Sequence, residues 1–136
     1  MKIIHKVAAV VIQNNAFLMV RKVGKDIWTS LGGKVEQGET EEEALTREIK
    51  EELDCGSVIL EKMGDFESGA IFDDATVRLS TYLVELKGNP KLSDPEYEEF
   101  RFIKENYKGE GIKLPDIIEE KVIPLCISRK LLSWNV

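Results

Sequence analysis

The sequence predicts a single mixed α/β domain that covers residues 1–136. Three observations support this. Several segments are rich in β-branched and alternating apolar residues, as strands are. One helix, near residues 40–54, has clear start and stop signals, and a second helix follows near residue 115. No repeat, low-complexity tract or linker divides the chain. We therefore expect helices packed on the faces of one sheet.

The first strands are expected at residues 6–13, "KVAAVVIQ", and 16–22, "AFLMVRK". Asn14 and Asn15 lie between them and tolerate the positive φ angles of a tight turn. The next stretch, 26–39, "DIWTSLGGKVEQGE", contains three glycines and is predicted to be a loop.

The central helix is marked at both ends. Thr40 as N-cap and Glu43 three residues later form a capping box, and the segment 54–56, "DCG", ends the helix. Between these signals an apolar stripe recurs at helical spacing. Its members are Ala44, Leu45, Ile49 and Leu53.

Strands are expected again at residues 57–68 and 76–88, followed by a loop at 89–99 and a short strand at 100–103. A final helix is predicted to begin near Pro115. Pro124 should break or kink it, because proline has no N–H and clashes with the preceding turn. The apolar residues of this helix are Ile117, Ile118, Val122 and Ile123.

Composition excludes several classes. With 43% hydrophobic and 32% charged residues, the chain is typical of a globular protein, and its apolar runs are too short to span a bilayer. The amino terminus lacks a small-residue cleavage site and is better interpreted as a strand than as a signal peptide. The two cysteines give no disulfide framework, so a cytoplasmic location is the default. The 19 basic and 25 acidic residues give a net charge of −6, which argues against non-specific nucleic-acid binding. Cys55 and Cys126 suit buried apolar positions.

Three glutamates of the central helix need an explanation. Glu48, Glu51 and Glu52 are spaced so that they share one helix face, where like charges repel. They also lie in the second half of the helix, where the dipole disfavours anions. Hard divalent cations would make the cluster favourable. On spacing alone, a repelling but tolerated surface is an equal alternative.

The wider pattern runs from Gly33, through five intervening residues to Glu39, and on to "REIKEEL" at 47–53. It resembles the Nudix box, the signature of hydrolases that cleave nucleoside diphosphates linked to another group. The match covers Gly33 to Cys55. In one departure, Asp54 stands where the family usually has glycine, and aspartate tolerates the left-handed conformation better than most residues.

The resemblance implies a Nudix-type α/β/α sandwich with a mixed β-sheet. It also implies a site for Mg²⁺, with Mn²⁺ as a substitute. The implied metal ligands are Glu48, Glu51, Glu52 and the backbone carbonyl of Gly32 or Gly33. Arg47 would orient the acids through a salt bridge, with Glu39 as its partner. The glycines Gly32, Gly33 and Gly38 would let the loop fold tightly against the helix.

Hydrolysis also needs a carboxylate that accepts a proton from water. In the Nudix family this base is a box glutamate, here Glu52, or an acid on a later loop. The stretch "SDPEYEEF" supplies Asp94, Glu96, Glu98 and Glu99. We favour Glu96; the alternative is that the whole stretch is a solvated acidic loop.

The "GGK" form of the box looks like that of the MutT-like branch, which converts nucleoside triphosphates to monophosphate and pyrophosphate. Lys34 and Arg21 would then contact phosphate, and Asp116 would read the base, although solvated surface roles explain each equally well. The window 69–74 lacks the proline of the ADP-ribose branch and the tyrosine of the diadenosine polyphosphate branch. These absences favour a nucleoside triphosphate, ordinary or oxidised.

Two other functions stay open: a hydrolase of ADP-ribose or a nucleotide sugar, and a non-catalytic nucleotide sensor. Sensors usually have a damaged box, whereas Arg47 and the three late glutamates are all present here. The expected partner is a small nucleotide, with neither nucleic acid nor membrane, and a homodimer stays open. The aromatics Trp28, Phe66, Phe72 and Phe102 suit either base stacking or the core, and His5 suits a structural role.

Overall fold

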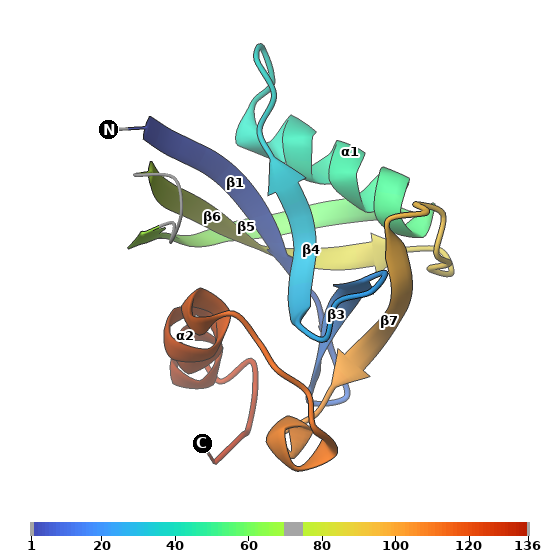
Figure 1. The fold of residues 1–136 in the computed structure, drawn as a ribbon, viewed down its shortest axis with the longest axis vertical. Helices are drawn as coiled ribbons and strands as arrows, with labels where there is room; N and C mark the ends of the chain where they lie inside the picture. The colour runs from blue at the N-terminus through green and yellow to red at the C-terminus, as the bar shows by residue number, and fades with distance from the viewer. Residues whose placement is uncertain (1, 70–74, 136) are drawn as a thin grey trace.

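The computed structural model describes residues 2–69 and 75–135 (Figure 1). Within these residues, seven strands form one mixed, curled sheet in the order β2-β3-β4-β1-β6-β5, with β7 beside β3. β1 and β6 are parallel, and the other pairs are antiparallel. The strands are β1 Lys2–Val10, β2 Ile12–Gln13, β3 Ala16–Lys22, β4 Trp28–Lys34, β5 Gly56–Gly69, β6 Ala75–Lys87 and β7 Tyr97–Ile103. Phe72 and most of the window 69–74 lie outside the described residues.

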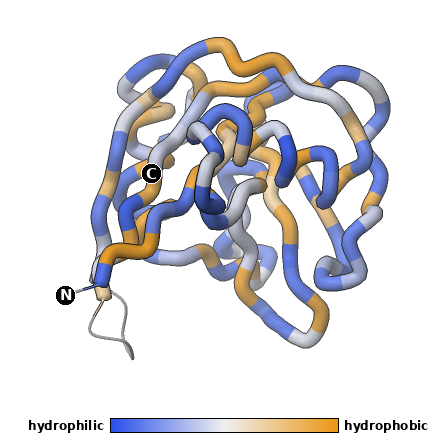
Figure 2. Tube along the Cα trace, turned by 90° about the horizontal axis from the view of Figure 1, so that it is seen from above, coloured by the Kyte–Doolittle hydropathy of each residue, from blue (hydrophilic) through white to orange (hydrophobic). Residues whose placement is uncertain are grey.

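The sheet buries a different set of side chains on each face. From β1, Val7 and Ala9 pack against helix α1, Glu41–Leu53, whereas Ala8 and Val10 pack against the C-terminal segment. That segment contains a 3₁₀ turn at Tyr107–Glu110, a π-helical turn at Ile118–Val122 and helix α2, Ile123–Ser128. Figure 1 shows α1 and α2 on opposite sides of the sheet, and Figure 2 shows hydrophobic and hydrophilic stretches following one another along the chain. The predicted α/β/α sandwich with a mixed sheet is confirmed.

Helix α1 begins and ends as predicted. Thr40 accepts a hydrogen bond from the backbone of Glu43, and the Glu43 side chain accepts one from the backbone of Thr40. Asp54 caps the C-terminus at φ 49°, in the left-handed region. The four stripe residues Ala44, Leu45, Ile49 and Leu53 are fully buried.

The loop predicted at 26–39 is wrong for residues 28–34, which form β4 between β1 and β3. Buried Trp28 and Leu31 anchor this strand in the two cores. Glycine is required at position 32 because φ is +140° and an added Cβ would lie 2.0 Å from the carbonyl oxygen of Val7. The glycines that suggested a loop instead allow close packing inside a sheet.

The C-terminal helix also has a form that the sequence only partly predicted. The helix widens into the π-helical turn, which ends two residues before Pro124, and then continues as α2, in which Pro124 is the second residue. Because proline offers no N–H, the irregularity appears as an extra residue in the preceding turn. Cys55 and Cys126 are buried and free, as expected. Across residues 2–69 and 75–135, no helix has the length and apolar character needed to cross a bilayer.

Candidate active site

Glu48 and Glu52 project from α1 toward the two glycines of β4. Glu52 is fully buried, and its Oε1 accepts a hydrogen bond of 3.1 Å from the Gly32 backbone N–H. Its other oxygen, Oε2, forms no hydrogen bond of good geometry within the described part of the chain, but the Tyr97 hydroxyl lies close enough to the carboxylate to lower its pKa. At Gly33, an added Cβ would lie 2.6 Å from the carboxylate of Glu48. The missing side chains of Gly32 and Gly33 therefore let both carboxylates pack directly against the β4 backbone.

These carboxylates carry a physical cost in the absence of a cation. Burial raises the pKa of Glu52 to about 8, although hydrogen bonds with Tyr97 and the Gly32 backbone lower it; the charges of Glu48 and Asp94 add a smaller upward contribution. Burial likewise raises the pKa of Glu48. A buried carboxylate oxygen without a partner is a donor that a hard divalent cation can use. The residues present therefore fit a metal ion.

Not all predicted ligands face the same point. In residues 2–69 and 75–135 no three acidic, histidine or cysteine side chains converge in a geometry ready to hold a metal. Glu51 is 52% exposed and turns toward Arg47. Ligation by Glu51 would require this side chain to rotate away from Arg47.

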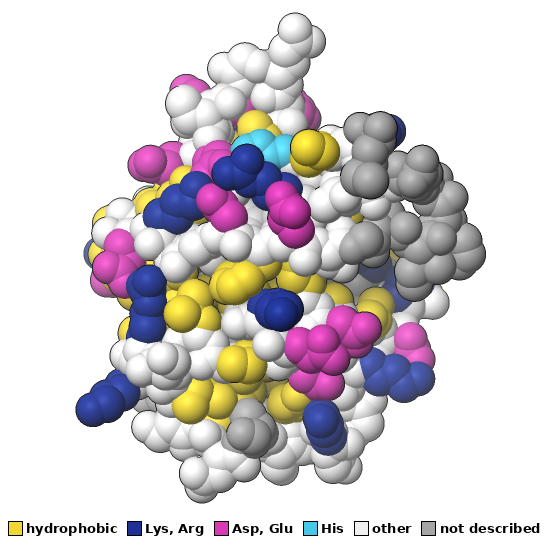
Figure 3. Space-filling model, turned by 90° about the vertical axis from the view of Figure 1, so that its left-hand side faces the viewer, with side chains coloured by type: hydrophobic (Ala, Val, Ile, Leu, Met, Phe, Trp, Pro, Cys, Tyr) yellow, Lys and Arg dark blue, Asp and Glu magenta, His cyan; other side chains and the backbone are white. Residues whose placement is uncertain are grey.

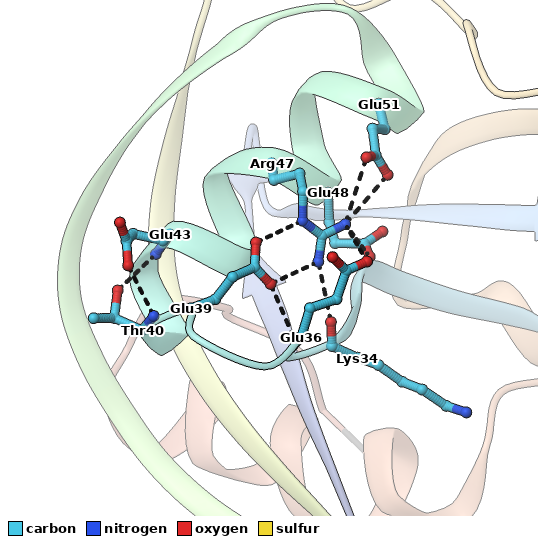
Figure 4. A network of polar contacts seen from close by, with 8 residues as sticks. All are labelled: Lys34, Glu36, Glu39, Thr40, Glu43, Arg47, Glu48 and Glu51. Atoms are coloured by element: carbon cyan, nitrogen blue, oxygen red, sulfur yellow. Dashed lines mark hydrogen bonds and ion pairs between the residues drawn. The ribbon is translucent and has the colours of Figure 1, made fainter.

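Arg47 lies at the centre of a polar network shown in Figure 4. Its Nε and Nη2 donate to the two oxygens of Glu39 at 2.7 and 2.9 Å, and Nη1 donates to Glu48 at 3.0 Å. The hydrogen bonds from Arg47 lower the pKa of Glu39 to about 2. Nη2 also donates to the carbonyl oxygen of Lys34 at 3.2 Å. The expected salt bridge between Arg47 and Glu39 is present, and it ties the loop after β4 to α1.

The acidic loop before β7 is tied to the C-terminal end of α1. Ser93 Oγ donates to the Glu51 carbonyl at 2.6 Å, and the Ser93 N–H donates to the Glu52 carbonyl at 3.1 Å. Lys91 N–H donates to the Leu53 carbonyl at 2.9 Å. These bonds satisfy helix-end carbonyls that α1 leaves open. They also hold Asp94 close enough to raise the pKa of Glu48 and Glu52.

A cavity of about 350 Å³ opens beside these carboxylates. Its lining includes acids and a phenol (Glu48, Glu96, Tyr97), lysines (Lys6, Lys22, Lys34), hydroxyl side chains (Thr29, Ser30), the glycines Gly32 and Gly33, and apolar residues (Val7, Ala8, Val77, Leu79, Pro115, Ile117, Ile118). Figure 3 shows one face of the molecule on which charged side chains border a stretch of exposed hydrophobic ones. The cavity therefore offers charged and apolar contacts to one ligand.

The structure brings some predicted residues to this cavity and leaves others outside it. Lys34 and Glu96 line it. Arg21 does not: it donates to Glu98 at 2.9 Å and to Glu99 at 3.0 Å. Asp116 is exposed and is not part of the lining, although the residues on either side of it are. Gly38 sits at φ +87° in the loop before α1.

Sequence reasoning missed Lys6, Lys22 and Tyr97. A signal for them would have required the strand register, which places Lys6 opposite Lys34 on the neighbouring strand. His5 is structural as expected, with Nε2 lying 2.8 Å from Glu41. Trp28 is buried in the core, and Phe66 and Phe102 pack against the cores, so none of these three lines the cavity.

Comparison with known proteins identifies the family. The NUDIX domain family matches residues 4–107 of the chain. The chain belongs to the Nudix family. This confirms the family and the enzyme class that the box predicted, pyrophosphohydrolases acting on phosphoanhydride bonds.

Individual Nudix relatives agree with this fold. The solution structure of the E. coli ORF135 protein matches with a TM-score of 0.75 and 25% identity, over 95% of this chain and 94% of that one. The MutT protein of Methanosarcina mazei Go1 matches with a TM-score of 0.77 and 22% identity, over 95% and 96%. A curated RNA pyrophosphohydrolase of Sulfurovum sp. (strain NBC37-1) is 31% identical over 96 residues, which span 59% of this chain and 60% of that protein's length.

Proposed function

We propose that this Nudix chain hydrolyses a nucleoside triphosphate, ordinary or oxidised, to monophosphate and pyrophosphate in the presence of Mg²⁺. The observation that carries the proposal is the cavity, because it places the carboxylate of Glu48, three lysines and an apolar wall around one space. A nucleoside triphosphate has the matching parts: a charged phosphate chain and a planar aromatic base whose faces can pack against apolar side chains. The protein's net charge of −6 makes a local source of positive charge necessary for such a ligand.

In this proposal Glu48, Glu51 and Glu52 hold the metal, together with the backbone carbonyl of Gly33. When bound, Mg²⁺, or Mn²⁺ in its place, supplies charge neutralisation at the phosphates and lowers the pKa of a coordinated water. The raised pKa values of Glu48 and Glu52 support this assignment, because burial disfavours the charged form of both carboxylates and a bound cation would offset that cost.

Arg47 and Glu39 would position the acids. Arg47 restrains Glu48 directly, and its contact with the Lys34 carbonyl holds the end of β4 against α1. The glycines Gly32, Gly33 and Gly38 shape the intervening backbone. Displacing a metal ligand by about 1 Å can lower the reaction rate roughly 100-fold, so the restraint that Arg47 and Glu39 provide matters to catalysis.

Two residues are candidates for the general base. Glu96 lines the cavity and is 67% exposed, so it can move toward a bound water. Glu52 has a pKa raised to about 8, but it is buried and is also a proposed metal ligand. We keep Glu96 as the base and Glu52 as a ligand. Base recognition by Asp116 requires its exposed side chain to turn toward the cavity that its neighbours line.

The test is a substrate panel with Mg²⁺: the common nucleoside triphosphates, oxidised guanine nucleotides, ADP-ribose, dinucleotide polyphosphates and nucleotide sugars. We expect pyrophosphate and monophosphate from a triphosphate. Turnover of ADP-ribose or a nucleotide sugar alone would overturn the substrate assignment and keep the site. Tight nucleotide binding without turnover would make the chain a sensor. RNA with a 5′-triphosphate belongs in the panel because one relative is named an RNA pyrophosphohydrolase.

A further inference from the structure

Lys6 and Lys34 occupy directly opposite positions on the antiparallel strands β1 and β4. Opposite residues on paired strands share one face of the sheet, so this register brings two ammonium groups to the same region. Like charges directly opposite each other destabilise a sheet. Sheet packing therefore gives no reason for this pair.

Neither lysine is neutralised by the fold. Across residues 2–69 and 75–135, no acidic side chain lies within ion-pair distance of the ammonium group of Lys6 or of Lys34. Figure 4 shows the Lys34 side chain pointing away from the acidic network around Arg47. Lys6 is half-buried, and burial together with the charges of Lys22 and Lys34 lowers its pKa.

Both lysines line the cavity, and their neighbours define its two ends. The next paired position along the strands is Val7 opposite Gly33, where the Glu48 carboxylate packs. On the other side of Lys6, its partner on β6 is Leu79, which belongs to the apolar wall. The lysine pair therefore lies between the carboxylates and the apolar wall.

Arg21 is not available for this role. Its guanidinium is held by Glu98 and Glu99 and lies 5.7 Å from the ring of Trp28, outside the cavity lining. Lys22 does line the cavity, but Glu96 lies 3.9 Å from its ammonium group. Lys6 and Lys34 are thus the cavity cations that the described residues leave without an acidic partner.

We propose that Lys6 and Lys34 form a paired-ammonium subsite for the polyphosphate chain of the substrate, and that Lys6 sets the affinity for that chain. The inference rests on the proposed function in naming the substrate, but the subsite itself requires only a polyphosphate anion. A phosphate placed between the two ammonium groups replaces their repulsion with two charge-assisted hydrogen bonds. Arginine at position 6 would keep the charge, whereas glutamine would remove it at similar size.

The experiment compares wild-type protein with Lys6→Gln, Lys6→Arg and the control Lys2→Gln, which changes an exposed lysine on the same strand outside the cavity lining. The probe is inorganic tripolyphosphate with Mg²⁺, titrated by calorimetry at two salt concentrations. Because Lys6→Gln loses a charge-assisted hydrogen bond, this variant should bind tripolyphosphate about tenfold more weakly than wild type. Its affinity should also depend less on salt concentration. Lys6→Arg and Lys2→Gln should stay within about threefold of wild type, a margin of about 0.7 kcal/mol.

Folding is checked separately. Removing one of two repelling charges should leave the melting temperature of ligand-free Lys6→Gln equal to or above that of wild type. The increase in melting temperature caused by tripolyphosphate should be smaller in this variant, because binding to the folded state is weaker. Equal tripolyphosphate affinity in wild type and Lys6→Gln overturns the subsite, and so does a wild type that does not bind tripolyphosphate.

The outcomes also separate this inference from the proposed function. If wild type hydrolyses triphosphates while Lys6→Gln has an unchanged KM and affinity, the subsite is wrong and the function stands. If wild type binds tripolyphosphate through Lys6 but hydrolyses no nucleoside triphosphate, the subsite stands and the substrate assignment is wrong.

Discussion

Arg47 and Glu39 are joined by two parallel hydrogen bonds, Nε to Oε2 at 2.7 Å and Nη2 to Oε1 at 2.9 Å. The pair links the loop after β4 to the middle of α1, and the same guanidinium reaches Glu48. Because the fork of arginine matches a carboxylate in two directions, the pair restrains orientation as well as distance. The position of the candidate metal ligand Glu48 therefore depends on Arg47 and, through Arg47, on Glu39, both of which lie outside the cavity lining.

Glu39→Gln should lower kcat/KM roughly 10- to 100-fold, the range for groups that orient metal ligands. The amide keeps the size of the side chain but loses the charge and one acceptor for Arg47. Steady-state kinetics on the best substrate measures the effect. Glu36→Gln is the matched control, because Glu36 is exposed and lies 3.7 Å from the same guanidinium. Equal losses in both variants would contradict a specific bracing role for Glu39.

The two glycines of β4 should respond differently to alanine. Gly32→Ala places a Cβ 2.0 Å from a backbone oxygen at φ +140°, so it should cost more than about 3 kcal/mol of folding stability. Gly33→Ala meets only the Glu48 side chain, which can rotate, so the protein should fold but lose most of its activity. Denaturant unfolding and activity assays test both. A fully active Gly33→Ala would mean that the position of Glu48 is unimportant.

Glu96→Gln should reduce kcat roughly 100- to 10,000-fold if Glu96 is the general base. Metal affinity should stay unchanged, because Glu96 is not a proposed ligand. Glu98→Gln is a control two residues away, on a side chain that pairs with Arg21 outside the cavity. If Glu96→Gln keeps wild-type kcat, the base is another group, with Glu52 as the first alternative.

Stability without metal should fall as the pH rises from about 4.5 toward 8. Burial raises the pKa of Glu52 in the folded state to about 8, above its ordinary value of 4.5. Over this window the unfolded chain has released a proton that the folded chain retains, so rising pH favours unfolding. Melting temperatures should show that Mg²⁺ stabilises the protein more at pH 8 than at pH 5. Glu52→Gln should remove most of this pH dependence; an unchanged profile would contradict the assignment.

Acid should destabilise the fold through a different pair of carboxylates. Burial alone would raise the pKa of Glu41, but hydrogen bonds from Tyr82, Lys62 and Ser80 lower it to about 2. A hydrogen bond from Ser80 is the main cause that lowers the pKa of Asp65 to about 2. Because both values lie below those of the unfolded chain, their contribution is present above about pH 4.5 and is lost as the pH falls toward 2. Melting temperatures of Glu41→Gln should change less over this range than those of wild type; equal slopes would contradict the prediction.

Sequence signals predicted those structural elements that are determined by residues close together in the chain. The capping box at Thr40 and Glu43, and the left-handed Asp54, are short-range features, so both ends of α1 were predictable. Strand β4 was missed because Gly32 and Gly33 resemble loop residues in sequence. Their need for glycine arises from Val7 and Glu48, which are distant in the chain.

The residues of the candidate site also fall into those that could be predicted from sequence and those that could not. The spacing of Arg47, Glu48 and Glu52 on one helix was readable. The structure places Glu48 and Glu52 against the β4 glycines and Arg47 against Glu48. The neutralisation of Arg21 by Glu98 and Glu99 depends on the pairing of β3 with β7. The entry of Lys6 into the cavity depends on its register with β4. Such relationships arise only when strands that are distant in sequence come together.

The central claim is that the late glutamates of α1 hold a divalent metal, and Mn²⁺ binding measured by electron paramagnetic resonance tests it most directly. The comparison uses wild type, Glu52→Gln and the control Glu42→Gln, which changes an exposed glutamate in the first turn of the same helix. We predict that wild type and Glu42→Gln bind Mn²⁺ equally and that Glu52→Gln loses at least about tenfold in affinity. Equal Mn²⁺ affinity in all three proteins would contradict the claim.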